Sequence, residues 1–278
     1  MAPPLNQKLQ GKVAVVTGGA SGIGEAAVRL FAAYGARAVV IVDIQDDKGH
    51  AVADSIGSDR CSYFQCDVTD EEKVRALMDW TAETYGGLDI VFSNAGTISP
   101  PNQSILELDL AVYDRVMRIN ARGMAVCVKQ AARKMVELGT RGSIVCTAST
   151  AATISSPTNV DYTMSKHALI GLMNSSFPTL GEHGIRINCV SPGVTATPLA
   201  INVWAGNAEE LAKMSEPLMC LKGAALKAEN VAEVAAFLGS DESAFITGQN
   251  LVVDGGMSIH AVIQTMTRAA AAAAASQL

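Results

Sequence analysis

The stretch that decides the fold runs Lys12-Val13-Ala14-Val15-Val16-Thr17-Gly18-Gly19-Ala20-Ser21-Gly22-Ile23-Gly24. Residues 12–17 are mostly apolar and β-branched, which predicts a buried strand. The glycines after it let the backbone turn tightly and approach a pyrophosphate, and a helix is predicted over residues 23–34. The N-terminus of that helix offers free N–H groups and the positive end of its dipole to phosphates. We therefore expect this turn to bind a dinucleotide through Gly18, Ser21, Gly22, Ile23 and Gly24.

The second predicted strand, residues 38–43, ends in the carboxylate of Asp43. Asp43 follows Gly24 by 19 residues, close to the ~20-residue spacing of an acid that hydrogen-bonds the adenosine ribose. Such a carboxylate accepts hydrogen bonds from the ribose hydroxyls of NAD and repels the 2′-phosphate of NADP. Ser21 and Ile44, which flank this position, are not basic. The sequence therefore predicts NAD as the cofactor.

Strand and helix patterns alternate along the rest of the chain. Further strands are expected at residues 61–66, 88–92, 143–147, 185–190 and 250–253, and further helices at residues 46–56, 70–85, 109–138, 160–181 and 229–239. Continuous apolar strands separated by helices are typical of a parallel sheet covered on both faces. Right-handed crossovers make this an α/β, Rossmann-type, doubly wound sheet. No linker interrupts the alternation, so we expect one domain over residues 1–260.

Composition excludes several classes of protein. Hydrophobic residues make up 49% of the 278 residues and charged residues 17%, which favours a folded chain with a large core. A net charge of −6 argues against a nucleic-acid partner. No apolar run approaches the ~18 residues that a membrane span needs. Residues 1–8 contain neither an apolar signal core nor an arginine, so we expect a cytoplasmic protein.

Cysteine and histidine give no metal pattern. The cysteines form no C-x-x-C pair, and we expect them to be reduced core thiols: Cys61, Cys66, Cys127, Cys146, Cys189 and Cys220. The four histidines have no metal-ligand spacing, so no metal site is expected.

Residues 193–225 interrupt the alternation and are interpreted as a substrate lid. The segment is an irregular insertion near the carboxyl ends of the strands, where ligands of open α/β sheets bind. Residues 151–160 contain no charged side chain. The lid adds apolar candidates, namely Leu199, Ile201, Val203, Trp204, Met214 and Leu218. A pocket without a fixed cation suits a compact apolar alcohol better than an acid, a phosphate or a coenzyme A ester.

Tyr162 and Lys166 lie four residues apart on a predicted helix and therefore share a face. A lysine ammonium beside a phenol lowers the phenol pKa, so that Tyr162 becomes a usable general base. Ser149 follows a predicted strand at its carboxyl end, where its hydroxyl is placed to hold a substrate oxygen. Asn120 is a polar residue in the middle of a long apolar helix. An exposed helix face remains the alternative for Tyr162 and Lys166 taken alone.

These residues, in this order, resemble the short-chain dehydrogenases/reductases over residues 8–258. The resemblance rests on Thr17-Gly-x-x-x-Gly22-x-Gly24, Asp67-Val68, Asn94-Ala95-Gly96, Asn120, Ser149, Tyr162-x-x-x-Lys166, Pro192-Gly193 and Asp254-Gly255-Gly256. It implies that Asn120, Ser149, Tyr162 and Lys166 are a catalytic tetrad, with Tyr162 and Lys166 also contacting the cofactor. By the same resemblance, the adenine contacts Asp67 and Val68, the cofactor floor is formed by Asn94, Ala95 and Gly96, and the nicotinamide end is lined by Pro192, Thr195 and Thr197.

A narrower resemblance is to plant dehydrogenases of cyclic monoterpenols, the borneol and isopiperitenol dehydrogenase group. It rests on Arg115-Val-Met-Arg-Ile-Asn-Ala-Arg-Gly, Val128-Lys-Gln-Ala-Ala-Arg-Lys-Met-Val-Glu-Leu and Met164-Ser-Lys. It implies an oxidation of a small secondary alcohol to its ketone. Relatives in the same plant branch cyclise an iridoid without net redox chemistry, so an NAD-binding cyclase or isomerase remains the alternative, and a non-catalytic NAD-binding protein is a third.

The family resemblance also implies a homotetramer paired through the helices at residues 109–138 and 160–181. Two departures from the family pattern bear on the site. Thr195 stands where isoleucine is common, which is expected to change packing on the nicotinamide, and Pro178 is expected to kink its helix well downstream of Tyr162. Residues 261–278, with seven consecutive alanines at residues 269–275, are expected to be a flexible tail.

Overall fold

The computed structural model describes residues 7–223 and 225–260, and the expected flexible tail at residues 261–278 lies outside them. The described residues form a single α/β domain around a seven-stranded parallel sheet. Its strands are β1 (Val13–Thr17), β2 (Ala38–Asp43), β3 (Cys61–Gln65), β4 (Ile90–Ser93), β5 (Ser143–Thr147), β6 (Arg186–Pro192) and β7 (Asn250–Val253). The helices are α1 (Gly22–Ala33), α2 (Asp46–Ile56), α3 (Glu71–Tyr85), α4 (Leu110–Val116), α5 (Met124–Leu138), α6 (Val160–Glu182), α7 (Pro198–Trp204), α8 (Ala208–Ser215) and α9 (Ala228–Gly239).

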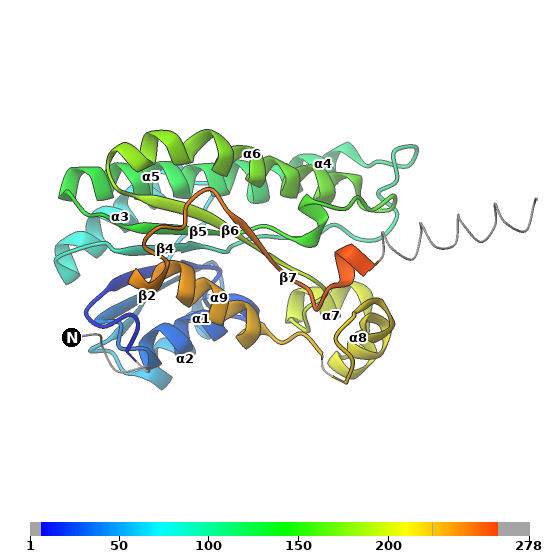
Figure 1. The fold of residues 1–278 in the computed structure, drawn as a ribbon, viewed down its shortest axis with the longest axis horizontal. Coiled ribbons are helices and arrows are strands. Elements are labelled where there is room, and N and C mark those ends of the chain that lie inside the picture. Colours follow the sequence, from blue (N-terminus) through cyan, green and yellow to red (C-terminus); the bar gives the residue numbers. More distant parts are fainter. Residues whose placement is uncertain (1–6, 224, 261–278) are drawn as a thin grey trace, which may run out of the picture.

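The strand order is β3-β2-β1-β4-β5-β6-β7, so the chain reverses direction across the sheet between β1 and β4. This is the topological switch point of a doubly wound sheet, where ligands bind beyond the carboxyl ends of the strands. Helices α3, α5 and α6 cover one face, and α1, α2 and α9 cover the other (Figure 1). The expected Rossmann-type fold is confirmed.

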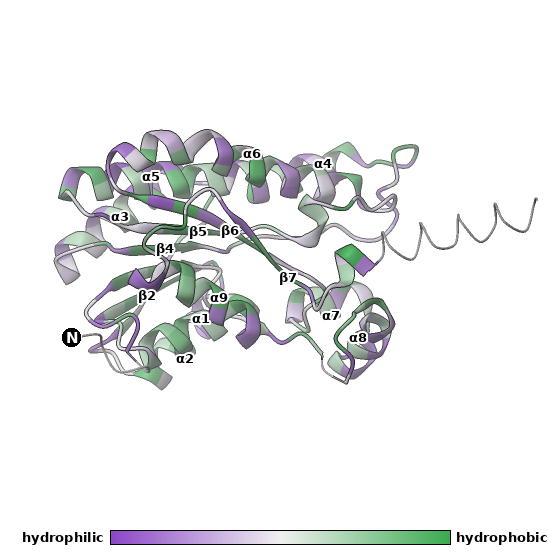
Figure 2. Cartoon of the chain, viewed as in Figure 1, coloured by the Kyte–Doolittle hydropathy of each residue, from purple (hydrophilic) through white to green (hydrophobic). Residues whose placement is uncertain are grey.

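Two apolar cores explain why the strands contain so few polar residues. The first lies between the sheet and α3, α5 and α6, and the second between the sheet and α1 and α9. All six residues of β2 are buried, as expected of a strand covered on both faces. Hydrophilic residues lie along the outer surface of the α5–α6 layer (Figure 2).

The predicted boundaries match the structure closely at β2, α2, β5 and β7, while the helix expected at residues 109–138 is divided. Between α4 and α5 the chain forms η1, a π-helical turn over Met117–Gly123. A π turn inserts one residue into the helical spacing, and the apolar period alone does not reveal it. Helix α6 continues through Pro178 to Glu182.

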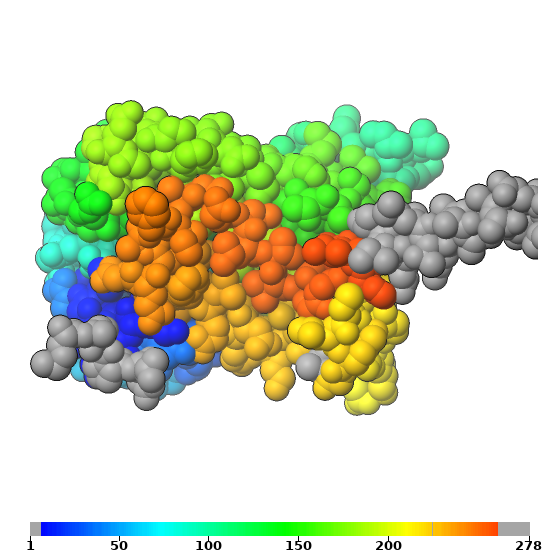
Figure 3. Space-filling model, viewed as in Figure 1, coloured from blue at the N-terminus to red at the C-terminus, as the bar shows by residue number. Residues whose placement is uncertain are grey.

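Within the predicted lid, the described residues 193–223 form two short α-helices, α7 and α8, and a 3-10 turn over Glu216–Leu218. Thr197 caps α7 by accepting a hydrogen bond from the Ala200 N–H at 3.3 Å. The end of the segment is bonded to the C-terminal part of the described chain, because the N–H groups of Cys220 and Leu221 donate to the Gly255 carbonyl at 2.9 and 3.1 Å. Figure 3 shows these two regions in contact at one end of the molecule.

The cysteines are free thiols, and all but Cys220 are buried. Burial raises the pKa of the Cys61 and Cys127 thiols to about 12. Thiols with raised pKa values are poor nucleophiles and poor metal ligands, in agreement with their expected role as small core residues.

Candidate active site

A cavity of about 740 Å³ opens at the carboxyl ends of the strands, at the switch point. It brings together most of the predicted site residues, which come from segments far apart in the sequence. The predicted residues in its wall are Gly18, Ser21, Gly22, Ile23, Asp43, Asp67, Val68, Asn94, Ala95, Gly96, Ser149, Tyr162, Lys166, Pro192, Thr195 and Thr197. Gly24 and Asn120 are not part of the wall; they lie behind it and act on it through neighbours.

The glycine-rich turn needs its glycines for two different reasons. Gly18 and Gly22 adopt φ values of +67° and +58°, which side chains other than glycine rarely adopt. Gly24 has an ordinary helical backbone, but a Cβ there would overlap the Gly18 carbonyl oxygen and lie 2.8 Å from the Asn94 Nδ2. Gly24 therefore allows α1 to pack directly against the turn.

The start of α1 is well suited to a phosphate. Ser21 stands at the N-cap with extended backbone, and among the described residues its side chain makes no capping hydrogen bond. The first N–H groups of an α-helix have no partner within the helix, so here they remain available to an anion. Thr197 at the start of α7 lies directly opposite, since a Cβ on Gly22 would be 3.2 Å from the Thr197 Cβ.

Asp43 is held rigidly at the end of β2. It is 6% exposed, and its Oδ2 accepts from the Ala20 N–H at 3.1 Å. Its Oδ1 accepts from the Ile44 and Gln45 N–H groups at 2.8 and 3.1 Å and from the Gln45 Nε2 at 3.2 Å. These bonds link the carboxylate to the glycine-rich turn, so the two elements that the sequence predicts to bind the cofactor form one unit.

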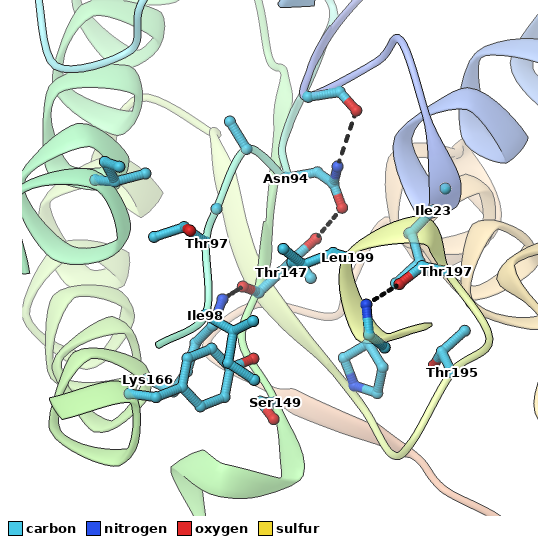
Figure 4. A pocket seen from close by; sticks show the side chains of 18 of the residues that line it. Ile23, Asn94, Thr97, Ile98, Thr147, Ser149, Lys166, Thr195, Thr197 and Leu199 are labelled. Atoms are coloured by element: carbon cyan, nitrogen blue, oxygen red, sulfur yellow. Dashed lines mark hydrogen bonds between the residues drawn. The ribbon is translucent and has the colours of Figure 1, made fainter. Parts of the chain in front are cut away.

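Asn94 connects the ends of three strands, and Figure 4 shows its bond to Thr147. Its Nδ2 donates to the Thr17 carbonyl at the end of β1 at 3.1 Å, and its Oδ1 accepts from the Thr147 hydroxyl at the end of β5 at 3.0 Å. The Lys166 Nζ in turn donates to the Thr147 carbonyl at 2.9 Å. The floor of the cavity is thus one hydrogen-bonded network from the glycine-rich turn to Lys166.

Asn120 lies in the π turn and is fully buried. Its Oδ1 accepts from the Thr97 N–H at 2.8 Å, and its Nδ2 donates to the Thr97 carbonyl at 2.9 Å and to the Ser165 hydroxyl at 3.0 Å. A Cβ on Gly96 would lie 3.3 Å from the Asn120 Oδ1 and 3.7 Å from the Lys166 Nζ. Because Gly96 has no side chain, a small space remains beside the Asn120 Oδ1 and the Lys166 Nζ.

The electrostatics of Tyr162 differ from the prediction. Burial raises the pKa of the Tyr162 phenol, and a hydrogen bond with Ser149 acts in the opposite direction. The expected lowering by Lys166 is wrong for this arrangement, because the Lys166 Nζ lies 5.6 Å from the centre of the Tyr162 ring and donates to Thr147 instead. Burial lowers the pKa of Lys166 itself, to about 8.

Residues predicted to contact the two ends of the cofactor line the cavity. Val68 is buried and Asp67 is exposed at the β3 end, where the Asp67 Oδ1 accepts from the Thr69 N–H at 2.8 Å. At the other end Thr195 is buried, and its hydroxyl donates to the Gly193 carbonyl at 3.0 Å.

The substrate side of the wall corrects two predictions. Of the six lid candidates, only Leu199 and Trp204 line the cavity, and both are on α7. The cavity wall also contains cations, since Lys48, Arg115 and Arg118 contribute to it. Residues 151–160 and the lid contribute no cation to the wall, as the sequence indicates for those segments.

Sequence reasoning missed several wall residues. Thr147 and Thr97 have a recognisable signal, because each follows or ends a strand at the edge where the site lies. Gln45 and Lys48 have none, since exposed polar residues at a helix start are common. The Lys48 Nζ donates to the Gln45 Oε1 at 2.8 Å, which ties both side chains to Asp43.

Within the described part of the chain, no three or more His, Cys, Asp or Glu side chains gather in a way that would hold a metal ion. In that same part, no helix is long and apolar enough to cross a membrane.

A doubly wound sheet with a glycine-rich turn at its switch point defines a dinucleotide-binding α/β protein. The family described as Enoyl-(Acyl carrier protein) reductase matches residues 18–258. A crystal structure of a short-chain dehydrogenase/reductase from Mycobacterium marinum is similar, with a TM-score of 0.83 and 32% identity, covering 91% of this chain and 98% of that one. The chain belongs to the short-chain dehydrogenase/reductase family, whose members use NAD(P).

Two plant relatives are equally similar in sequence. A (+)-cis,cis-nepetalactol synthase of Nepeta racemosa is 58% identical over 253 residues, which are 91% of this chain and 94% of that protein. A (−)-isopiperitenol/(−)-carveol dehydrogenase of Mentha piperita, named as mitochondrial, is 58% identical over 251 residues, which are 90% of this chain and 95% of that protein. The protein is thus an oxidoreductase-family relative of a monoterpenol dehydrogenase and of iridoid cyclases.

Proposed function

We propose that this protein oxidises a small apolar secondary alcohol to its ketone with NAD as the oxidant. The observation that carries the proposal is the arrangement at one cavity of Ser149, Tyr162 and Lys166 with a complete cofactor cradle. Bound NAD⁺ would accept the hydrogen that leaves the carbinol carbon with its electron pair. The chain itself has to bind and orient both molecules and to remove the hydroxyl proton.

The residues present fit a dinucleotide. The uncapped start of α1 suits the pyrophosphate, and Asp43 at the end of β2 suits the ribose hydroxyls. Asp43 also favours NAD over NADP, because a buried carboxylate repels a 2′-phosphate. Exposed Lys48, tied to Gln45 at 2.8 Å, is the nearby cation that would have to be redirected for NADP to bind.

Tyr162 is the proposed general base. Its burial raises its pKa, so the phenolate needs support from neighbours when it takes the proton. Ser149 provides one such hydrogen bond and is also placed to hold the reacting oxygen. Lys166, with a pKa near 8, is the proposed contact to the nicotinamide ribose.

Asn120 is proposed to hold a water molecule that passes the proton from Lys166 toward solvent. The space left by the missing side chain at Gly96 supports this, since it borders the Asn120 Oδ1 and the Lys166 Nζ. The bonds of Asn120 to Thr97 and Ser165 keep the amide oriented for that role.

The proposed substrate is a cyclic monoterpenol such as borneol or isopiperitenol. The uncharged wall of residues 151–160 and the apolar Leu199 and Trp204 of α7 support a compact hydrocarbon. The dehydrogenase relative from Mentha piperita supports the same substrate class.

A homotetramer in the cytoplasm is the proposed form. Exposed apolar residues on α5 and α6, such as Val136 and Met164, support association, and the mass in solution measures it.

A redox-neutral cyclase or isomerase is the second candidate, because the nepetalactol synthase of Nepeta racemosa is as similar as the dehydrogenase. The two activities differ in a single readout. A cyclase keeps NAD bound without consuming it, whereas a dehydrogenase releases NADH with every turnover.

The test follows NADH absorbance while the protein is offered NAD and a panel of monoterpenols. We expect NADH with at least one alcohol, and loss of that activity in Tyr162→Phe with NAD binding retained, since the ring remains and only the proton acceptor is lost. Turnover of a reactive dialdehyde without NADH from any alcohol would favour the cyclase. An active Tyr162→Phe variant would show that the base is misassigned.

A further inference from the structure

Asp161 is a fully buried carboxylate directly before Tyr162 in the first turn of α6. Its Oδ1 accepts from the Ser99 hydroxyl at 2.9 Å and from the Tyr162 N–H at 2.8 Å. Its Oδ2 is buried and has no hydrogen-bond partner within the described residues. No lysine, arginine or histidine in that part of the chain lies within 4.0 Å of the carboxylate to form an ion pair.

Such a group is costly, because a carboxylate taken out of water needs partners for both oxygens. Asp161 has partners for only one of them. Stabilisation of the fold therefore does not explain a buried carboxylate at this position. What its position does provide is the pair of bonds at Oδ1, which join two separate segments of the chain.

The first of these segments is the loop between β4 and α4, which contains Ser99. This loop is fastened to the start of α6 at further points. The Asn159 Nδ2 donates to the Ser99 Oγ at 3.4 Å, and the Gln103 N–H donates to the Thr158 carbonyl at 2.8 Å. The Val160 N–H donates back to the Gln103 carbonyl at 3.0 Å. Among these contacts, only the bond between Ser99 and Asp161 reaches the residue next to Tyr162.

Both segments continue directly into the cavity wall. Ile98, one residue before Ser99, and Tyr162, one residue after Asp161, both line the cavity. Figure 4 shows Ile98 beside Lys166 and Ser149, on the side where the alcohol would bind. The bond from Ser99 to Asp161 thus sets the separation between an apolar wall residue and the phenol.

We propose that Asp161 is a positioning residue, tied to Ser99, that fixes Tyr162 and the Ile98 wall relative to each other and so orients the alcohol. The inference rests on the proposed dehydrogenase function. Asp161 acts through geometry and not through charge, in agreement with the pKa of Tyr162, whose shift arises from burial and from Ser149. The acceptor at Oδ1 is the required feature, and an amide carbonyl in its place provides the same acceptor.

The test compares Asp161→Asn with Asp161→Ala in steady-state oxidation of the preferred alcohol. We expect Asp161→Ala to lose ~10–100-fold in kcat/KM for the alcohol, the scale of a small misplacement of reacting groups, with its KM for NAD unchanged. Asp161→Asn should restore most of this loss and keep the pH profile of the wild type. Ser99→Ala should show the same loss in kcat/KM. If Asp161→Ala does not fold, Ser99→Ala is the variant that tests the proposal.

Asp109→Ala is the matched control, because Asp109 is an exposed acid at the opposite end of the same loop that caps α4. The proposal is overturned if Asp161→Asn is as impaired as Asp161→Ala, if KM for NAD rises in parallel with the alcohol defect, or if Asp109→Ala is equally impaired.

A readout without turnover separates this proposal from the proposed function. In a double-mutant cycle on urea unfolding, Ser99→Ala and Asp161→Ala should be non-additive, and additive effects overturn the tether. If the cycle shows coupling while the wild type oxidises no alcohol, the dehydrogenase function fails and the tether between the two segments stands.

Discussion

Substituting Gly24 by alanine tests how the glycine-rich turn is built. In an unhindered helix this change stabilises a protein by about 0.5–1 kcal/mol, because glycine loses more backbone entropy on folding. At Gly24 the added Cβ would overlap the Gly18 carbonyl oxygen and lie 2.7 Å from its carbon. The clash is with backbone, which cannot rotate away as a flexible side chain does.

The size of the stability change depends on how far the glycine-rich turn can shift to make room for the added Cβ. Gly18 donates to the Val42 carbonyl at 2.7 Å, and Asn94 lies on its other side, so the turn has little room to shift. Overpacking of this kind costs about 1–3 kcal/mol, which exceeds the helical gain. We expect a net loss of about 1–2 kcal/mol, which lowers Tm by roughly 2–8 °C for a chain of this size.

The assay is thermal unfolding with and without NAD. A ligand at 100 times its Kd stabilises the folded state by about 2.7 kcal/mol, and we expect Gly24→Ala to lose most of this increment because the phosphate cradle is displaced. Gly171→Ala in α6 is the matched control, because a Cβ there meets nothing within 4 Å. It should raise Tm slightly and leave NAD binding unchanged. A Gly24→Ala variant that is as stable as Gly171→Ala, with normal NAD binding, would refute the packing argument.

Three further predictions concern the cofactor, the buried lysine and the lid. Asp43→Asn removes a charged acceptor, so the KM for NAD should rise ~10-fold or more and the preference for NAD over NADP should narrow in initial-rate assays, whereas an unchanged ratio would contradict the role of Asp43. Folded Lys166 loses its proton near pH 8 and unfolded lysine near 10.5, so the unfolded chain binds more protons in between and stability should rise with pH. Urea unfolding measured from pH 8 to 10 should show this rise in the free energy of unfolding of the wild type minus that of Lys166→Met. The slope of this difference should be at most about 1.4 kcal/mol per pH unit. A difference that does not change with pH would argue against the lowered pKa. Trp204→Ala should raise the KM for the alcohol roughly tenfold while Met214→Ala, outside the cavity wall, leaves it unchanged; equal effects would show that α8 also contacts the substrate.

The fold was predictable because its signals are local and repeated. A strand buried on both faces is apolar in its interior, and residues 38–42 and 144–146 show this directly in their composition. Helices between such strands leave few alternatives to a doubly wound sheet. The glycine-rich turn and Asp43 then locate the switch point, and the structure brings them together through the bond from the Ala20 N–H to Asp43.

The sequence indicated which residues would meet at one cavity, and it indicated less about their physical chemistry. The pKa of Tyr162 depends on how deeply the phenol is buried and where the Lys166 Nζ points, and neither follows from a four-residue spacing. Arg115 of α4 and Arg118 of the π turn line the cavity, and the apolar period of the predicted helix does not indicate this. The lid candidates Met214, on α8, and Leu218, just after it, lie outside the cavity wall and are exposed, so an apolar residue in this segment does not by itself indicate a pocket residue.

The sequence by itself determined the doubly wound sheet, the glycine-rich turn, the carboxylate at the end of β2 and the list of polar residues at the carboxyl edge. These features depend on the apolar periodicity of short segments and on the conformational freedom of single residues. Both are properties of residues that are close together in the chain. Only the tertiary structure decided the separation of Lys166 from the Tyr162 ring, the π turn that carries Asn120 and the buried bond between Ser99 and Asp161. The bond from Lys166 to Thr147 and the bond from Ser99 to Asp161 join residues 19 and 62 positions apart. The energies of such contacts depend on distance and desolvation, which are set only when the chain has packed.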